Sequence, residues 1–125
     1  NSSHANAIGK SILAWLPDIE IERIVGQKGL TRFTAATITD FGNLKKNLRL
    51  VRRFGCAYDY EEFLLGVVSI GIALRDQVGT VLGSVSCTLP ESRASDENVE
   101  IIKNALVDCV TNLAVKIEYP KINSF

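Results

Sequence analysis

The sequence predicts an α+β domain, because helical and strand-like patterns alternate along its 125 residues. Residues 67–74 and 80–89 alternate large apolar side chains with small or hydroxyl-bearing ones around a short polar turn, which is typical of an antiparallel hairpin. Before and after it, apolar residues recur at the three- and four-residue spacing of amphipathic helices. Because one face of the hairpin is strongly apolar, we expect an antiparallel sheet with helices packed on that one face.

Two short helices are expected first. Residues 4–16 form one of them, with Ser3 as its N-cap. Its apolar side consists of Ile8, Ile12, Trp15 and Leu16. Pro17 opens the second helix, over residues 17–25, and the glycines at 26 and 29 end it. Residues 30–39 are rich in β-branched side chains without clear alternation, which indicates an irregular or short extended connection.

A third helix is expected over residues 41–54, capped by Thr39 or Asp40 and ended by Gly55. Its apolar residues share one arc, and five basic residues share the other: Lys45, Lys46, Arg49, Arg52 and Arg53. Such an arc either faces solvent or contacts nucleic acid. The lack of interleaved aromatic residues and the neutral net charge favour solvent.

Residues 56–60 are expected to be extended, and the hairpin follows them. With Gln77 and Val78 at the tip, Ser69 lies opposite Ser86, Gly71 opposite Ser84 and Val67 opposite Thr88. This register gathers large apolar side chains on one face, namely Val68, Ile70, Ile72, Leu74, Val81, Val85 and Cys87. The other face carries Ser69, Gly71, Ala73, Ser84, Ser86 and Thr88.

A long last helix is expected from Ser95, with acidic residues in its first turn. We expect Pro120 to end this helix. Its apolar stripe consists of Val99, Ile102, Leu106, Val110, Leu113 and Ile117.

Charge and composition exclude several classes. Lys and Arg total 14 and Asp and Glu total 14, so there is no global field to attract nucleic acid or an anionic membrane. No apolar run is long enough for a membrane span, and no secretion signal opens the chain. Three cysteines without metal-ligand spacing indicate reduced, buried thiols in a cytoplasmic protein.

The small, hydroxyl-bearing sheet face leaves room above it and offers donors and acceptors, which suits a small polar ligand. The alternative is that this face meets only water. Asp59, Glu61 and Glu62 lead into the same strand, so at least one carboxylate could lie over this face. The alternative, which we expect for Glu61 and Glu62, is a carboxylate in solvent.

Metal binding and catalysis find little support. His4 is the single histidine, and no set of His, Asp and Glu has metal-ligand spacing. A nucleophile requires a base within hydrogen-bond reach, and His4 has no evident partner in the sequence. We therefore expect no metal, no cofactor and no enzymatic activity.

Several spaced motifs together resemble one known family. They are residues 4–10 (HANAIGK), 37–40 (TITD), 51–62 (VRRFGCAYDYEE), Gly66, the 76–79 turn, 86–88 (SCT) and 92–93 (SR). The set covers nearly the whole chain and resembles the effector-binding domain of IclR-type bacterial transcription regulators.

This resemblance implies a GAF-like domain that binds a small acidic metabolite and signals to a separate winged helix-turn-helix. The positions it implies for ligand binding are Ala7, Ile8, Asp59, Val67, Ser69, Ser86 and Thr88. Two residues depart from the family pattern: Thr88 stands where a second Ser is usual, and Leu89 replaces a Gly. Pocket size and turn geometry therefore do not follow from the resemblance.

The resemblance also implies that residues 1–125 are a single effector-binding domain, truncated at its N-terminus and lacking the DNA-binding domain. Its expected partners are a carboxylic acid effector, DNA through the missing domain, and further copies in a homodimer or homotetramer. Two alternatives stay open. One is a ligand-free GAF-like module for oligomerisation, and the other is an enzyme built on the acidic cluster.

Overall fold

Three antiparallel strands form one sheet in the order β1–β2–β3. A computed structural model describes residues 2–123 of the chain, with side chains to residue 116. The strands are β1 (Ala57–Tyr60), β2 (Val67–Arg75) and β3 (Val81–Pro90). Helices α1 (Ala7–Leu13), α2 (Asp18–Lys28) and α3 (Phe41–Phe54) precede them, and the 3-10 turn η1 (Glu91–Arg93) leads into α4 (Asp96–Asn123). The predicted α+β class and antiparallel sheet are confirmed.

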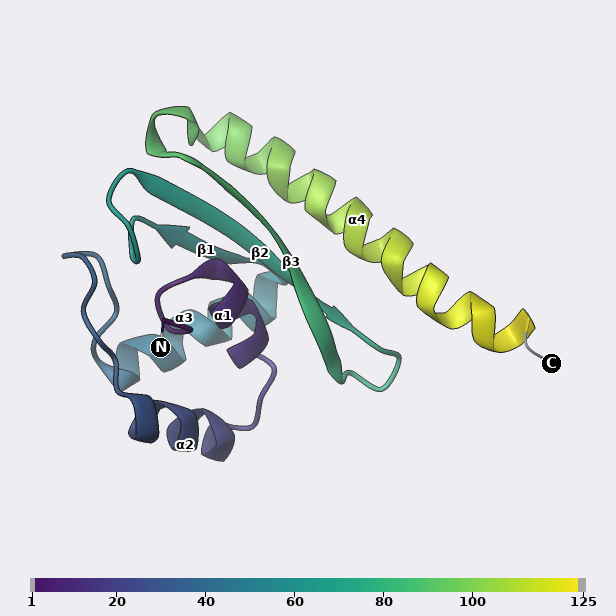
Figure 1. Ribbon diagram of the computed structural model, residues 1–125, viewed down its shortest axis with the longest axis horizontal. Coiled ribbons are helices and arrows are strands. Elements are labelled where there is room, and N and C mark those ends of the chain that lie inside the picture. The colour runs from purple at the N-terminus through teal and green to yellow at the C-terminus, as the bar shows by residue number, and fades with distance from the viewer. Residues whose placement is uncertain (1, 124–125) are drawn as a thin grey trace.

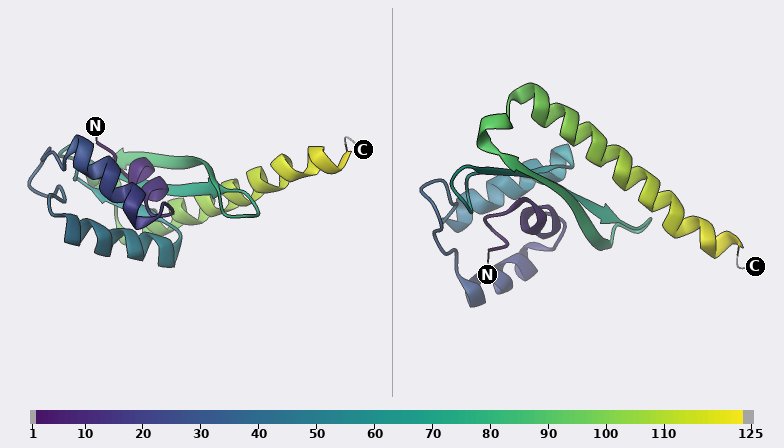
Figure 2. Two further views of the ribbon diagram at one scale, coloured as in Figure 1. Left: turned by 90° about the horizontal axis from the view of Figure 1, so that it is seen from below. Right: turned by 45° about the horizontal axis from the view of Figure 1, so that its top comes forward.

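Helices lie on both sides of this sheet (Figure 1). Helix α4 covers the apolar face, as expected, through a cluster that includes Ile70, Ile72 and Val99. The other face is covered by α1, behind which α2 and α3 pack (Figure 2). Helices were expected on one face of the sheet, and the structure has them on both. The small side chains of the second face leave space for α1 to pack closely against it.

Helix α3 forms as its local sequence predicts. The Asp40 side chain accepts a hydrogen bond from the N–H of Asn43 at 2.9 Å, and Gly55 ends the helix in the left-handed conformation, with φ of 75°. Leu44, Leu48 and Val51 are buried at helical spacing, whereas Leu50 and Phe54, also expected on the apolar arc, are exposed. These signals are all local, so they are readable without knowledge of the tertiary structure.

Helix α1 differs from its prediction in cap and in orientation. Its N-cap is Asn6, whose side chain accepts from the N–H of Gly9 at 2.7 Å, while Ser3 belongs to the preceding turn. Ile8 is 47% exposed, although it was expected on the apolar side. The buried side consists instead of Ala7, Lys10, Ser11, Leu13 and Ala14.

Two other helix ends were predicted wrongly. Helix α2 continues past residue 25 and through Gly26 to Lys28, although Gly29, also expected at its end, does end it, with φ of 73°. Helix α4 continues past Pro120 to Asn123. Its predicted stripe packs against the sheet from Val99 to Val110, whereas Ile117 lies outside the residues with described side chains.

The β2–β3 register lies two residues further along β3 than predicted: Ser69 pairs with Thr88 and Gly71 with Ser86. Two one-residue shifts add up to this difference. The loop spans residues 77–79, closed by a hydrogen bond from Asp76 N–H to Thr80 C=O, and a bulge beyond Leu74 leaves Leu82 unpaired. Since strand side chains alternate with a period of two, the residues before the bulge keep their predicted faces. Val81, beyond the bulge, is the exception, because it pairs with Arg75 on the small face.

The three cysteines are free and unequally exposed: Cys56 is buried, Cys87 half-buried and Cys109 exposed. The expectation of buried thiols is thus correct for Cys56 and wrong for Cys109, since α4 turns that residue outward. Among the described helices, none combines the length and the apolar composition that crossing a bilayer requires.

Candidate functional site

A partly open cavity of about 440 Å³ lies between the start of α1, the small face of the sheet and the loop after β1. Its lining contains all seven positions predicted as ligand-binding: Ala7, Ile8, Asp59, Val67, Ser69, Ser86 and Thr88. These residues come from α1 and from all three strands. The fold therefore brings the seven together, and whether they bind a ligand stays a prediction.

The floor of the cavity differs from the predicted hydroxyl face in one respect. Ser86 and Thr88 are exposed on β3, and within the described residues their hydroxyl groups bond to no other protein group. The hydroxyl group of Ser84 lies 2.9 Å from that of Ser11 and 3.2 Å from the carbonyl oxygen of Ile72, so it is already bonded. Two of the β3 hydroxyls are thus available to a ligand, and the third is structural.

Asp59 is buried at 3% exposure and lies at the edge of this floor. Its Oδ1 accepts the N–H of Glu62 at 2.7 Å, and its Oδ2 accepts the Ser69 hydroxyl group at 3.1 Å. Each carboxylate oxygen has a further lone pair, because an ionised carboxylate offers about four acceptor sites. Asp59 can therefore hold a ligand hydroxyl or a water while keeping its own position.

The wall formed by α1 stands directly on the sheet. A Cβ atom added at Gly71 would lie 2.8 Å from the backbone oxygen of Ala7, so this contact requires glycine. The N–H groups of Ala7 and Ile8 are in the first turn of α1 and have no intrahelical acceptor. Both residues belong to the cavity lining.

Three lining residues were not predicted: Asn6, Phe63 and Leu64. Phe63 packs edge-on against Phe33 with ring centroids 4.9 Å apart, which links the loop after β1 to the segment between α2 and α3. A sequence signal existed, since three large apolar residues, Phe63, Leu64 and Leu65, directly follow the acidic pair.

The acidic cluster divides into different environments. Glu62 is buried and pairs with Lys10, so its prediction as a solvated residue was wrong. Burial raises the pKa of the Glu62 carboxyl, although the Lys10 ammonium group opposes this shift. Glu61 is half-buried and its carboxylate accepts the N–H of Gly66 at 2.8 Å.

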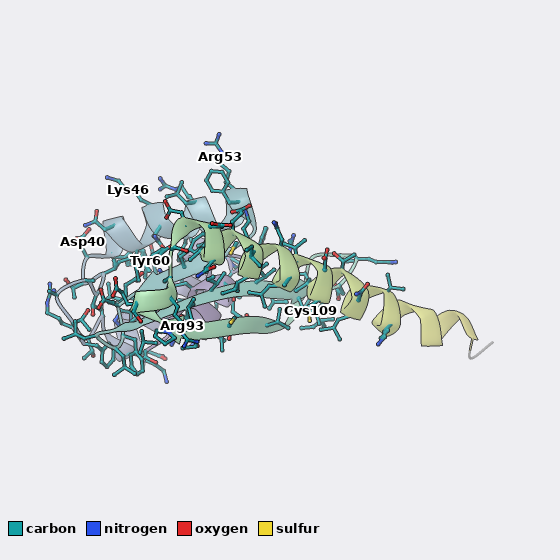
Figure 3. All side chains as sticks on the ribbon, turned by 90° about the horizontal axis from the view of Figure 1, so that it is seen from above. Asp40, Lys46, Arg53, Tyr60, Arg93 and Cys109 are labelled. Carbon is teal, nitrogen blue, oxygen red and sulfur yellow. The ribbon has the colours of Figure 1, made fainter. Side chains whose placement is uncertain are left out.

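The described part of the chain offers no arrangement of side chains for metal binding or for catalysis by His4. His4 lies away from the cavity lining, with its Nε2 atom 2.8 Å from the Thr31 carbonyl oxygen and its ring against Phe33. No group of three or more His, Cys, Asp and Glu residues is placed to hold a metal within these residues. Lys46 and Arg53 on α3 point away from the body of the molecule, as a solvated face does (Figure 3).

Two further cavities are less suited to a ligand. One, of about 220 Å³, lies among α1, α2 and α3, and there Arg52 already donates to the carbonyl oxygens of Ala14 and Leu16. The other, of about 490 Å³, lies beside the exposed hairpin tip, and Thr80 is the polar side chain in its lining. The cavity over the small sheet face combines unbonded hydroxyls with a carboxylate.

Residues 1–115 match the family model described as bacterial transcriptional regulator IclR C-terminal. The chain belongs to the IclR family. The HTH-type transcriptional repressor AllR of Escherichia coli K12 is 33% identical over 117 residues, which are 90% of this chain and 43% of that protein. The chain therefore spans less than half the length of the curated IclR-family relatives it matches, and these are transcription regulators, not enzymes.

Solved structures agree with this assignment to the IclR family. The C-terminal domain of the E. coli regulator KdgR superposes with a TM-score of 0.84 at 29% identity, over 90% of this chain and 69% of that one. A double mutant of the inducer-binding domain of PobR from Acinetobacter, in complex with 3-hydroxybenzoic acid, gives 0.84 at 25% identity, over 90% and 65%.

Proposed function

We propose that this IclR-family domain senses a small carboxylic acid and that a longer protein containing it uses the signal to change its affinity for DNA. The observation that carries the proposal is the cavity itself: seven residues from four elements converge on it, and two of its hydroxyl groups are unbonded. Its volume of about 440 Å³ is in the range of small-molecule sites.

In this proposal the ligand carboxylate is held by neutral donors. Ser86 and Thr88 offer hydroxyl groups, and Ala7 and Ile8 offer N–H groups, while no Lys or Arg is in the described lining. Asp59 and Ser69 then orient a ligand hydroxyl or a water. The PobR neighbour, whose inducer-binding domain holds 3-hydroxybenzoic acid, supports an acid that also carries a hydroxyl.

The remaining expectations belong to the whole protein. We propose that residues 1–125 act as one effector-binding domain, and that a helix-turn-helix outside them binds DNA, as the name of the AllR relative suggests. We further propose a homodimer or homotetramer that works in the cytoplasm, where bacterial DNA is located. A ligand-free oligomerisation module is not favoured, because α1 covers part of the hydroxyl face and leaves a cavity there.

The test is a titration of oxo, sugar and aromatic acids, including 3-hydroxybenzoate, against the wild type and two serine variants. Ser86→Ala removes an unbonded hydroxyl from the cavity and is expected to weaken binding of a responsive acid about tenfold or more, as loss of a hydrogen bond to a charged ligand does. Ser84→Ala is the matched control, because that hydroxyl is bonded within the protein.

Calorimetry measures the dissociation constants of the three proteins. Equal affinities of the wild type and Ser86→Ala for a bound acid contradict the assignment of the site. Failure of every acid to bind the wild type contradicts the proposed ligand class.

A further inference from the structure

A buried ion pair lies behind the cavity. The Lys10 side chain is 0% exposed, and its Nζ donates to both Oε1 and Oε2 of Glu62 at 2.9 Å each. Neither residue lines the cavity. Any influence of this pair on a bound ligand therefore acts through other residues.

On the α1 side, the pair fixes the helix that forms one cavity wall. Lys10 follows Ala7 by one turn on the buried side of α1, and the start of this helix supplies Asn6, Ala7 and Ile8 to the lining. Because a helix is a stiff element, the position of the Lys10 ammonium group constrains the position of that wall.

On the other side, the pair fixes the loop after β1. The N–H of Glu62 donates to Asp59 and its carbonyl oxygen accepts the Thr37 hydroxyl group at 2.5 Å. The next two residues, Phe63 and Leu64, form a second wall of the cavity, since both belong to its lining. The Glu62 backbone thus holds Asp59 and the loop, and its carboxylate joins them to α1.

Stability alone does not account for such a pair. Removing both ions from water offsets most of their attraction, so an apolar pair of similar volume is often at least as stable. The ion pair instead fixes the distance between two segments of the chain. Both carboxylate oxygens of Glu62 accept hydrogen bonds from the Lys10 ammonium nitrogen, although the two residues are 52 positions apart in the sequence.

We infer that Lys10 and Glu62 are positioning residues, which hold the start of α1 and the loop after β1 at the spacing the cavity requires. Their relevance to an effector rests on the proposed function. The positioning itself is testable without any ligand.

The test compares amide hydrogen exchange in the full chain and in its Lys10→Met/Glu62→Leu double variant, with urea unfolding as the measure of global stability. We expect similar unfolding free energies but exchange about tenfold faster at Glu62 N–H and at residues 63–66, because the loop opens locally. Amides near Leu48 in α3 keep their rates. The control is Glu20→Leu/Arg23→Met, which replaces an exposed ion pair on α2 in the same way and leaves the loop unchanged.

Loop exchange equal to that of the wild type overturns the inference. If the double variant does not fold, Lys10→Arg serves in the same comparison, because it keeps the charge and changes the spacing. A bound acid such as 3-hydroxybenzoate provides a second measurement. Its affinity is expected to fall about tenfold in the double variant as the site loses preorganisation, and unchanged affinity overturns the role of the pair in the site.

A wild type that binds none of the acids contradicts the proposed function alone. The exchange comparison still decides whether Lys10 and Glu62 position the two walls, so the two failures are distinguishable.

Discussion

Identical side chains serve different purposes in this domain, depending on what lies above them. Ser84 and Ser86 share one face of β3, yet Ser84 is bonded to Ser11 under α1 while Ser86 lies beyond the helix and lines the cavity. Lys10 likewise lies on the buried side of α1, where most lysines are not found. Position relative to α1 thus separates structural polar groups from those available to a ligand.

The protonation of Glu62 predicts a pH dependence of stability. Because its folded pKa is raised above the ordinary value of 4.5, the protonated form favours folding, and this contribution is fully present below pH 4.5. It is lost as the pH rises through the folded pKa. The wild type is therefore expected to lose stability relative to Glu62→Gln between pH 4.5 and neutral pH.

Urea unfolding of both proteins across pH 4 to 8 measures this difference, with about 1.4 kcal/mol for each unit by which the pKa is raised. The opposite trend, in which the wild type gains on Glu62→Gln with rising pH, would show that attraction to Lys10 outweighs burial.

Single residues differ in how far the sequence predicts them. Five of the seven cavity residues lie within the spaced motifs, and the family resemblance implied the other two, Val67 and Ser69. The strand period also places Ser69, Ser86 and Thr88 on one face even with a register error of two. The Lys10–Glu62 pair was not predicted, because its partners are 52 positions apart and Glu62 follows the exposed-looking Glu61. A lysine at helical spacing from Ala7 and Ala14 was the available signal.

At the scale of elements, predictability follows the range of the interactions. Helix α3 is set by Asp40, Gly55 and its own apolar stripe, all of them local. The orientation of α1 depends instead on the sheet beneath it, where Gly71 and Ser84 leave space for small side chains only. Ala7 and Ser11 therefore turn inward and Ile8 outward, which periodicity of apolar residues does not predict.

The α1–sheet contact predicts a large difference between two glycine substitutions. Gly71→Ala places a Cβ atom 2.8 Å from the Ala7 backbone oxygen, so α1 must move, and we expect a loss of about 1–3 kcal/mol in unfolding free energy, as for other overpacked cores. Gly83→Ala, in β3, meets no atom within 4 Å and is the control.

Urea unfolding measures both variants. Because α1 carries the cavity wall, acid binding is also expected to weaken in Gly71→Ala and to stay unchanged in Gly83→Ala. Equal stabilities of the two variants would contradict the close packing of α1 on the sheet.

At the scale of the whole molecule, the zero net charge is consistent with a domain that does not itself bind DNA. With 14 basic and 14 acidic residues, this domain contributes no general attraction to DNA. Its IclR-family relatives, of whose length it spans less than half, are named as HTH-type repressors. The proposed function therefore separates two binding sites: this domain recognises the acid, and another part of the protein recognises DNA.

Two separate sites predict reciprocal coupling: acid binding changes the affinity for DNA, and DNA binding changes the affinity for the acid. In a full-length protein that contains this domain and its helix-turn-helix, a saturating acid is expected to change DNA affinity by about 5- to 150-fold, and DNA must change acid affinity by the same factor. Fluorescence anisotropy with a DNA site chosen by in vitro selection measures both. Ser86→Ala is expected to bind DNA like the ligand-free wild type and to lose the response at acid concentrations that saturate the wild type, whereas Ser84→Ala keeps it. A DNA affinity that saturating acid leaves unchanged contradicts the coupling, because a ligand shifts an equilibrium only by its difference in affinity for the two states.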